Sequence, residues 1–144
     1  MLLLLLPLGL IASSLIRGYQ SPARLREIAG VLASGAPLLD VRSPGEFASG
    51  HHRRARNLPV GDLAGRLGEI GAPGDPVVVH CQSGARSGQA CRILKAGGFT
   101  RVYDLGAYRN LARLPEVPRD GQEAAPVLTR NQRRRERQRL THRG

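Results

Sequence analysis

The chain has 144 residues, a formal net charge of +11, 18 glycines, 10 prolines and no tryptophan. This length is enough for one compact domain with tails, and the presence of only two cysteines excludes a disulfide framework. No Cys/His spacing in the sequence matches a zinc site. Because aromatic residues are few, the core must consist mainly of Leu, Val, Ile and Ala side chains.

The first 16 residues form an uncharged segment that is mostly leucine. Its length lies between the apolar part of a signal peptide and the roughly 17–25 residues of a membrane-spanning helix. We therefore expect residues 1–16 to be a signal or membrane anchor segment. The first charges, Arg17, Arg24 and Arg26, follow this segment, and by the positive-inside rule they favour a cytoplasmic domain.

A helix is predicted from Ser21 to Gly35. Ser21 suits the N-cap, and Pro22 suits the first helical position. Glycine at position 35 is a typical helix end. The apolar residues at helical spacing are Leu25, Ile28, Ala29 and Leu32.

The next predicted elements are a buried strand over residues 38–41 and a short helix that runs through Phe47. The Ser43-Pro44-Gly45-Glu46 segment matches a capping box with proline at the first helical position. We expect an ion pair between Arg42 and Glu46. Further along, we expect a strand over residues 57–60 and an amphipathic helix over residues 62–70.

Cys81 directly follows a second buried strand, residues 77–79, and precedes a loop of small residues. Helical spacing resumes after Arg86 and stops at Gly97-Gly98. Ligands of open α/β sheets bind at the carboxyl ends of the strands, so we expect Cys81 to lie at the functional site. Cys91 lies one to two turns along this helix and is predicted to be a buried hydrophobic residue.

The residues after Cys81 are predicted to bind an anion. Their backbone N–H groups, together with the N-terminus of the following helix, would form an anion nest. These donors and the Arg86 guanidinium favour the thiolate over the thiol at Cys81. A thiolate in such a pocket is a nucleophile for an anionic, electrophilic substrate. The predicted binding residues are Gln82, Ser83, Gly84, Ala85, Arg86 and Ser87.

These motifs resemble the rhodanese (sulfurtransferase) family, in the same order and over about half of the chain. The run Ser87-Gly88-Gln89-Ala90 is most similar to small single-domain periplasmic rhodaneses of the phage-shock type. The resemblance rests on Leu39-Asp40-Val41-Arg42-Ser43-Pro44-Gly45-Glu46-Phe47, Gly50-His51, Ala55, Asn57-Leu58-Pro59, Cys81 to Ser87 and Leu94 to Gly106.

The resemblance implies a sulfurtransferase that moves sulfane sulfur from thiosulfate or a similar donor to cyanide or a thiol acceptor. The sulfur would be carried as a persulfide on Cys81, with no metal and no organic cofactor. Arg86 would orient the anionic donor, and Asp40, Arg42 and Glu46 would have supporting roles. The likeness to periplasmic members favours a periplasmic domain, so the side of the membrane stays open.

Two other functions stay open. The first is a non-catalytic, membrane-tethered persulfide carrier or binding module, which would keep the same cysteine. The second is a cysteine phosphatase or arsenate reductase, but these enzymes have five residues between the cysteine and the arginine, whereas four separate Cys81 from Arg86.

The run Gly50-His51-His52-Arg53-Arg54 departs from the family's Gly-His-Ile-Pro-Gly and keeps the carrier possibility open. It is either an anion-attracting rim or a solvated loop.

The predicted elements, which end with a strand over residues 102–105 and a short helix, alternate between helix and strand. We therefore expect residues 21–113 to form a three-layer α/β/α rhodanese-like domain around a central, mainly parallel sheet. Residues 114–144 are rich in proline and then in arginine, which predicts a disordered tail. Three alternatives stay open for this tail: contact with anionic lipid, contact with nucleic acid, or a solvated chain.

Overall fold

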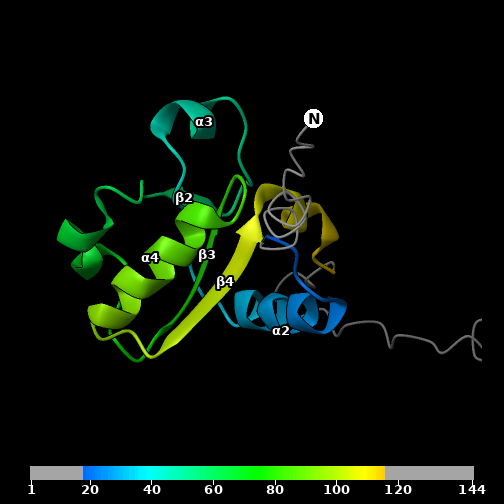
Figure 1. The fold of residues 1–144 in the computed structure, drawn as a ribbon. Helices are drawn as coiled ribbons and strands as arrows, with labels where there is room; N and C mark the ends of the chain where they lie inside the picture. Colours follow the sequence, from blue (N-terminus) through cyan, green and yellow to red (C-terminus); the bar gives the residue numbers. More distant parts are fainter. Residues whose placement is uncertain (1–17, 116–144) are drawn as a thin grey trace, which may run out of the picture.

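The computed structural model describes residues 18–115, in which four parallel strands form a sheet in the order β2-β1-β3-β4 (Figure 1). The strands are β1 (Leu38–Asp40), β2 (Ala55–Asn57), β3 (Pro76–Cys81) and β4 (Arg101–Ala107). The α-helices are α2 (Pro22–Ala33), α3 (Pro44–Ala48) and α4 (Ala85–Ala96), and the 3-10 helices are η1 (Leu63–Gly65), η2 (Leu67–Glu69) and η3 (Tyr108–Arg113).

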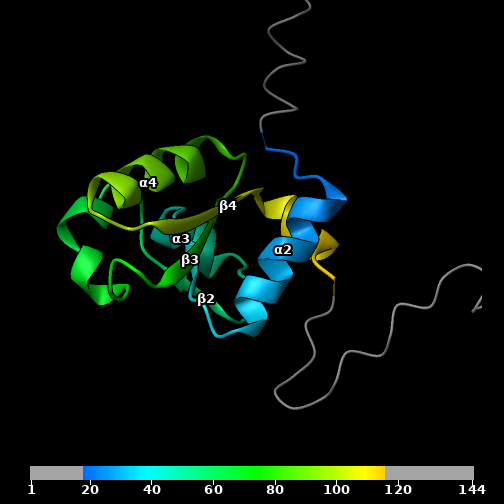
Figure 2. The same cartoon turned by 90° about the horizontal axis from the view of Figure 1, so that it is seen from below.

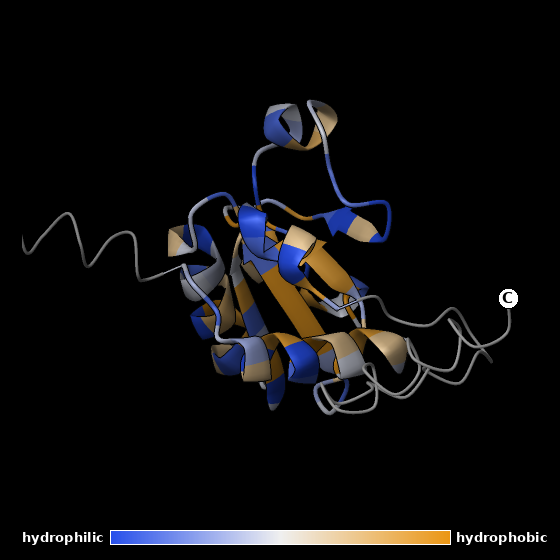
Figure 3. Cartoon of the chain, turned by 90° about the vertical axis from the view of Figure 1, so that its right-hand side faces the viewer, coloured by the Kyte–Doolittle hydropathy of each residue, from blue (hydrophilic) through white to orange (hydrophobic). Residues whose placement is uncertain are grey.

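Helices cover both faces of the sheet (Figure 2). One face packs on α4 in a buried cluster that includes Val79 and Leu94, and the other packs on α2 in a cluster that includes Ile28 and Val78. Figure 3 shows that the central strands are apolar, whereas the helices carry both apolar and polar residues. A parallel sheet needs this cover on both faces. The predicted three-layer α/β/α fold is confirmed, and every strand pair in the sheet is parallel.

The first two helices begin where the sequence predicted. The Ser21 hydroxyl accepts the Arg24 N–H at 3.2 Å and caps α2. Both hydrogen bonds of the capping box between Ser43 and Glu46 are present at the start of α3. The predicted apolar face of α2 is buried through Leu25, Ile28, Ala29 and Leu32.

Two elements between β1 and β3 differ from the prediction. The predicted amphipathic helix over residues 62–70 is wrong, because the chain forms η1 and η2 with a break at Arg66 (φ −127°, ψ 21°). Gly65 and Gly68 lower the helical preference of this segment, while Leu63 and Ile70 keep it anchored in the core. The predicted strand over residues 57–60 is displaced, and β2 ends at Asn57. Proline at position 59 cannot donate to a strand partner.

β4 carries one extra residue, Leu105, opposite the end of β3. The register shifts there, so that His80 pairs with Gly106 and Cys81 pairs with the last residue of β4. Gly106 has a φ of +78°, a conformation that glycine adopts without strain. Its N–H donates to Asp104 Oδ1 at 2.8 Å, which holds this bulge beside the end of the central strand.

The residues before α2 lie against the same end of β4. The Gly18 carbonyl accepts an N–H of the buried Asn110 side chain at 2.6 Å and the Ala107 N–H at 3.3 Å. A side chain at position 18 would collide with the Ser83 carbonyl of the Cys81 loop. The chain therefore enters the domain in direct contact with the candidate functional loop.

Within residues 18–115, no helix has the length and apolar character that a bilayer crossing requires. The predicted signal or anchor segment, residues 1–16, lies outside the described residues. Nearly all of the predicted tail, residues 114–144, lies outside them as well.

Candidate active site

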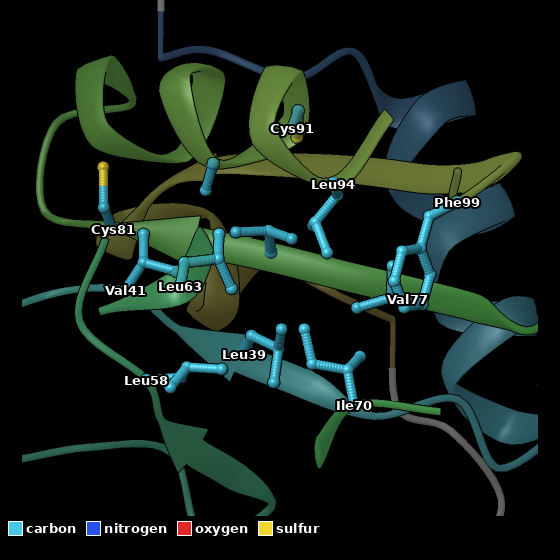
Figure 4. Close-up of a cluster of buried hydrophobic side chains, with 12 residues drawn as sticks. Leu39, Val41, Leu58, Leu63, Ile70, Val77, Cys81, Cys91, Leu94 and Phe99 are labelled. Atoms are coloured by element: carbon cyan, nitrogen blue, oxygen red, sulfur yellow. The ribbon is translucent and has the colours of Figure 1, made fainter. Parts of the chain in front are cut away.

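Cys81 is the last residue of β3, at the carboxyl edge of the sheet. Figure 4 shows it at one end of the apolar cluster, with Val77 and Phe99 at the other end. The Gly84 N–H donates to Cys81 Sγ at 3.1 Å, so a loop amide points directly at the sulfur. Cys81 has 0% relative exposure, so a donor reaches the sulfur only when the groups that cover it move.

The loop after Cys81 is shorter than predicted, because α4 begins at Ala85 and not after Arg86. Gln82, Ser83 and Gly84 form the turn, and Ala85, Arg86 and Ser87 form the first turn of α4. Gly84, at a φ of +99°, is the N-cap, and no side chain caps this helix terminus. The first N–H groups of an α-helix have no acceptor within the helix. Of the predicted binding residues, Gly84 contacts the sulfur directly through its N–H, and the others lie in the loop and helix turn around it.

Neighbouring elements hold this loop in place. The Tyr108 N–H donates to the Gln82 carbonyl at 3.1 Å, and Ser83 forms an isolated bridge with Ala107. The buried Ser87 hydroxyl donates to the Gly84 carbonyl at 3.1 Å. These contacts fix the loop from the β4 side and from within α4.

Asp40 and Arg42 form a buried ion pair beside the loop. Arg42 Nη2 donates to Asp40 Oδ2 at 2.7 Å, and Arg42 Nε lies 3.0 Å from both carboxylate oxygens. The hydrogen bond to Asp40 raises the pKa of Arg42. The same guanidinium donates to the Gly50 carbonyl at 2.8 Å and lies 4.3 Å from the centre of the Tyr108 ring. Its Nη1 also reaches Gln82 Oε1 at 3.4 Å, so the pair supports the loop.

Glu46 pairs with Arg86, and the predicted ion pair between Arg42 and Glu46 is wrong. Arg86 Nη1 and Nη2 donate to the two Glu46 oxygens at 2.6 and 2.8 Å. Arg42 turns instead into the interior, where Asp40 needs a partner because it has no access to water. The role of Arg86 in orienting a donor stays a prediction, and the structure shows both its terminal nitrogens engaged.

The Glu46 carboxylate also accepts from Ser43, whose N–H and hydroxyl lie 2.9 and 3.0 Å from Oε2. Hydrogen bonds from Arg86 and from the Ser43 backbone hold the pKa of Glu46 well below its usual range. Glu46 is therefore ionised at every pH at which the domain would act. The ion pair joins α3 to the first turn of α4, directly after the Cys81 loop.

We expect Glu46→Gln to remove a pH-dependent part of the stability. Because the folded-state pKa is lowered, the Glu46 contribution is complete above its unfolded pKa and declines as the pH falls toward the folded value. The difference in free energy of unfolding between wild type and Glu46→Gln should be constant from about pH 7 to about pH 5, and shrink below about pH 4.5. Urea unfolding across this range measures it, and a difference that grows at low pH would contradict the assignment.

The basic run from Gly50 to Arg54 leads away from the site. The Gly50 carbonyl contacts Arg42, but Arg54 Nη2 donates to the Leu32 carbonyl at 2.7 Å, at the end of α2. β2 starts directly after Arg54 and runs parallel to β1, so Arg54 lies at the opposite edge of the sheet from Cys81. Arg54 therefore contributes to the C-terminus of α2 and not to an anion-attracting rim.

His80 is a buried residue of the site that the sequence interpretation missed. It has 0% relative exposure, and neither ring nitrogen has a hydrogen-bond partner among the described residues. Nε2 lies 3.7 Å from Asp40 Oδ2, but burial dominates and lowers the pKa of His80. Its position directly before Cys81, on the α2 face by strand alternation, is the signal that would have identified it.

Cys91 is buried in α4, as predicted. Burial raises the pKa of its thiol to about 12, so it remains a neutral thiol at physiological pH. Among residues 18–115, no group of three or more His, Cys, Asp or Glu side chains is placed to hold a metal ion. Of the two cysteines, Cys81 at the carboxyl edge of β3 is therefore the candidate nucleophile.

A cysteine at the end of a central parallel strand, covered by a loop of amide donors that opens a helix, defines a class of α/β proteins with a thiol-centred site. The chain belongs to the rhodanese-like domain family, whose model matches residues 23–111. The predicted family is confirmed.

Relatives in the family include sulfurtransferases. The chain is 34% identical over 80 residues to thiosulfate sulfurtransferase PspE of Escherichia coli, a match that covers 55% of this chain and 76% of PspE. It is 44% identical over 70 residues to the uncharacterized protein YqhL of Bacillus subtilis, covering 49% of this chain and 55% of YqhL. The solved structure of the human single-domain sulfurtransferase TSTD1 superposes with a TM-score of 0.54 at 31% identity, covering 62% of this chain and 93% of that chain. The chain spans less than two thirds of the length of the first curated relatives it matches.

Proposed function

We propose that this protein is a sulfurtransferase that carries sulfane sulfur as a persulfide on Cys81. The observation that carries this proposal is the amide contact at the sulfur, where the Gly84 N–H donates to Cys81 Sγ at 3.1 Å. An amide donor stabilises negative charge on that atom, which is the charge of both a thiolate and a persulfide. The names of relatives such as PspE and TSTD1 support the same chemistry.

In the first half-reaction, the Cys81 thiolate attacks the outer sulfur of thiosulfate or a similar donor. A bond forms between Cys81 Sγ and that sulfur, the sulfur–sulfur bond of thiosulfate breaks, and sulfite leaves with the electron pair. The loop N–H groups from Gln82 to Ser87 stabilise the persulfide and the charge that develops on the way to it. This step proceeds without a metal or an organic cofactor.

In the second half-reaction, cyanide or a thiol attacks the outer sulfur of the Cys81 persulfide. The Sγ–S bond breaks and its electron pair returns to Cys81 as the thiolate, so the enzyme is regenerated. Two steps through a covalent intermediate predict ping-pong kinetics. Because Cys81 is fully buried, acceptor and donor both depend on movement of the groups around the sulfur.

The same burial favours a second candidate, a persulfide carrier that turns over slowly. A covered persulfide is protected from solvent thiols until a partner opens the loop. The two candidates differ in steady-state rate: a carrier becomes persulfidated but forms little thiocyanate from cyanide. The phosphatase alternative is weaker, because the four-residue loop between Cys81 and Arg86 is one residue shorter than the phosphatase loop and Arg86 is engaged with Glu46.

We expect the protein to retain one sulfur atom after incubation with thiosulfate and removal of excess reagent. Intact-protein mass spectrometry measures the added sulfur, and subsequent addition of cyanide should remove it and release thiocyanate. Prior alkylation of Cys81 is the control and should prevent the addition. Absence of any adduct, together with turnover of a phosphate ester, would reverse the assignment.

A further inference from the structure

Two arginines flank the Cys81 loop, and a carboxylate neutralises each of them. Arg42 Nε and Nη2 contact both oxygens of the buried Asp40. Arg86 gives both terminal nitrogens to Glu46, at 2.6 and 2.8 Å. Arg86 lies in the first turn of α4, two residues after Gly84, whose N–H contacts Cys81 Sγ at 3.1 Å, so this ion pair lies beside the loop that holds the sulfur.

The Glu46 carboxylate is a fixed negative charge at the loop. Four donors hold it: the two nitrogens of Arg86, and the N–H and hydroxyl of Ser43. The capping box anchors Glu46 to α3, so the carboxylate does not depend on Arg86 alone for its position. Both partners are about one-third exposed, so the pair is accessible to solvent and to dissolved anions.

Glu46 cancels the positive charge of Arg86, and the nearby histidines do not supply another one. Burial lowers the pKa of His80. Burial, and then Arg53 and Arg54, lower the pKa of His52. Arg54 itself binds the Leu32 carbonyl at the opposite edge of the sheet. A thiolate at Cys81 is therefore balanced mainly by backbone amides, which carry only partial charges.

We propose that Glu46 is a specificity-determining residue that makes the site favour sulfane-sulfur donors with at most one negative charge over dianionic thiosulfate. The donor class is organic thiosulfonates and hydropersulfides. The proposal rests on the sulfurtransferase function proposed above and names its substrate class. Each extra negative charge on a donor is repelled by the Cys81 thiolate, and the Glu46 carboxylate cancels the attraction that the Arg86 guanidinium would otherwise supply.

Both types of donor can transfer their terminal sulfur to Cys81 and release a stable leaving group. With a thiosulfonate, the Cys81 thiolate attacks the terminal sulfur, the sulfur–sulfur bond breaks, and the sulfinate leaves with the electron pair and one negative charge. With a hydropersulfide, the terminal sulfur and its proton transfer to Cys81, and a thiolate leaves. Neither step needs an external oxidant or reductant.

The test compares thiosulfate, a dianion, with benzenethiosulfonate, a monoanion that offers the same type of terminal sulfur. The measured quantity is the ratio of kcat/KM for thiosulfate to kcat/KM for benzenethiosulfonate, from cyanide-dependent thiocyanate formation. Comparing this ratio between variants cancels the difference between the leaving groups. We expect Glu46→Gln to raise the ratio about five- to tenfold, the effect of one unit charge acting across a partly solvated site.

The chain offers a matched control and an opposing variant. Glu69 forms an exposed bidentate pair with Arg66 at 2.8 Å, so Glu69→Gln removes an equivalent ion pair and should leave the ratio unchanged. Arg86→Gln leaves Glu46 unneutralised and should lower the ratio. The double variant Glu46→Gln/Arg86→Gln should return it to within about twofold of wild type, because the net charge is restored.

A ratio in Glu46→Gln that stays within about twofold of wild type, or that falls, overturns the proposal. Salt provides a further test: raising ionic strength from about 0.05 to about 0.5 M should narrow the difference in this ratio between wild type and Glu46→Gln, because screening weakens the effect of a single charge. A difference that widens with salt also contradicts the proposal. If the proposed sulfurtransferase function itself is wrong, wild type forms no Cys81 persulfide with either donor, and no ratio can be measured.

Discussion

Replacing Cys81 by serine should reduce cyanide-dependent thiocyanate formation by at least about 10³-fold. The serine hydroxyl occupies nearly the same volume beneath the Gly84 N–H, but it is not ionised near neutral pH and cannot form a persulfide. Intact-protein mass spectrometry after exposure to thiosulfate should show no added sulfur on the variant. Steady-state assays with saturating donor measure the loss of turnover.

Cys91→Ala is the matched control for this experiment. Cys91 is buried in α4 and burial raises its pKa to about 12, so it is a poor nucleophile at neutral pH. We expect Cys91→Ala to keep the sulfur adduct and turnover within a few-fold of wild type. If the adduct persists in Cys81→Ser and disappears in Cys91→Ala, the nucleophile has been assigned to the wrong cysteine.

Arg42→Met should lower the free energy of unfolding by about 3–5 kcal/mol, the cost of leaving a buried charge without its partner. Asp40 has 0% relative exposure, and Arg42 supplies its side-chain ion-pair contacts. Methionine fills similar space but donates no hydrogen bond to the carboxylate. The loss also removes the contacts with the Gly50 carbonyl and the Tyr108 ring, so the loop region should loosen as well.

Urea unfolding monitored by circular dichroism measures this effect, and Arg66→Met is its control. Arg66 pairs with Glu69 at 2.8 Å, but both side chains are exposed, so we expect Arg66→Met to lower the free energy of unfolding far less than Arg42→Met. Because the pair supports Cys81, sulfur transfer by Arg42→Met should fall by more than the folded fraction alone explains. A loss of stability no larger than that of Arg66→Met would show that Asp40 finds another partner.

Local signals in the sequence were sufficient for the parts of the site that lie close together in the chain. The apolar run that ends at Cys81 predicted β3, and small residues followed by helical spacing predicted the loop and α4. The capping box from Ser43 to Glu46 was also predicted correctly, because its hydrogen bonds join residues only three apart.

The wrong predictions about the site concern side chains whose partner is distant in the sequence, or for which two partners are available. Arg42 and Glu46 are four residues apart, a spacing that favours pairing within a helix. Arg42, however, precedes α3 and turns inward to Asp40, while Glu46 meets Arg86 from forty positions away. The orphan nitrogens of His80 could not be predicted either, since they depend on what packs against β3 from α2 and β4.

Gly18 has a practical consequence for defining the smallest active fragment. Its carbonyl is bound by Asn110 and Ala107, and its lack of a side chain lets it lie against Ser83 in the Cys81 loop. The family match begins only at residue 23, so a fragment cut at that boundary would keep every strand and lose this brace. We expect such a fragment to hold the Cys81 loop less well, so a fragment for functional work should include Gly18.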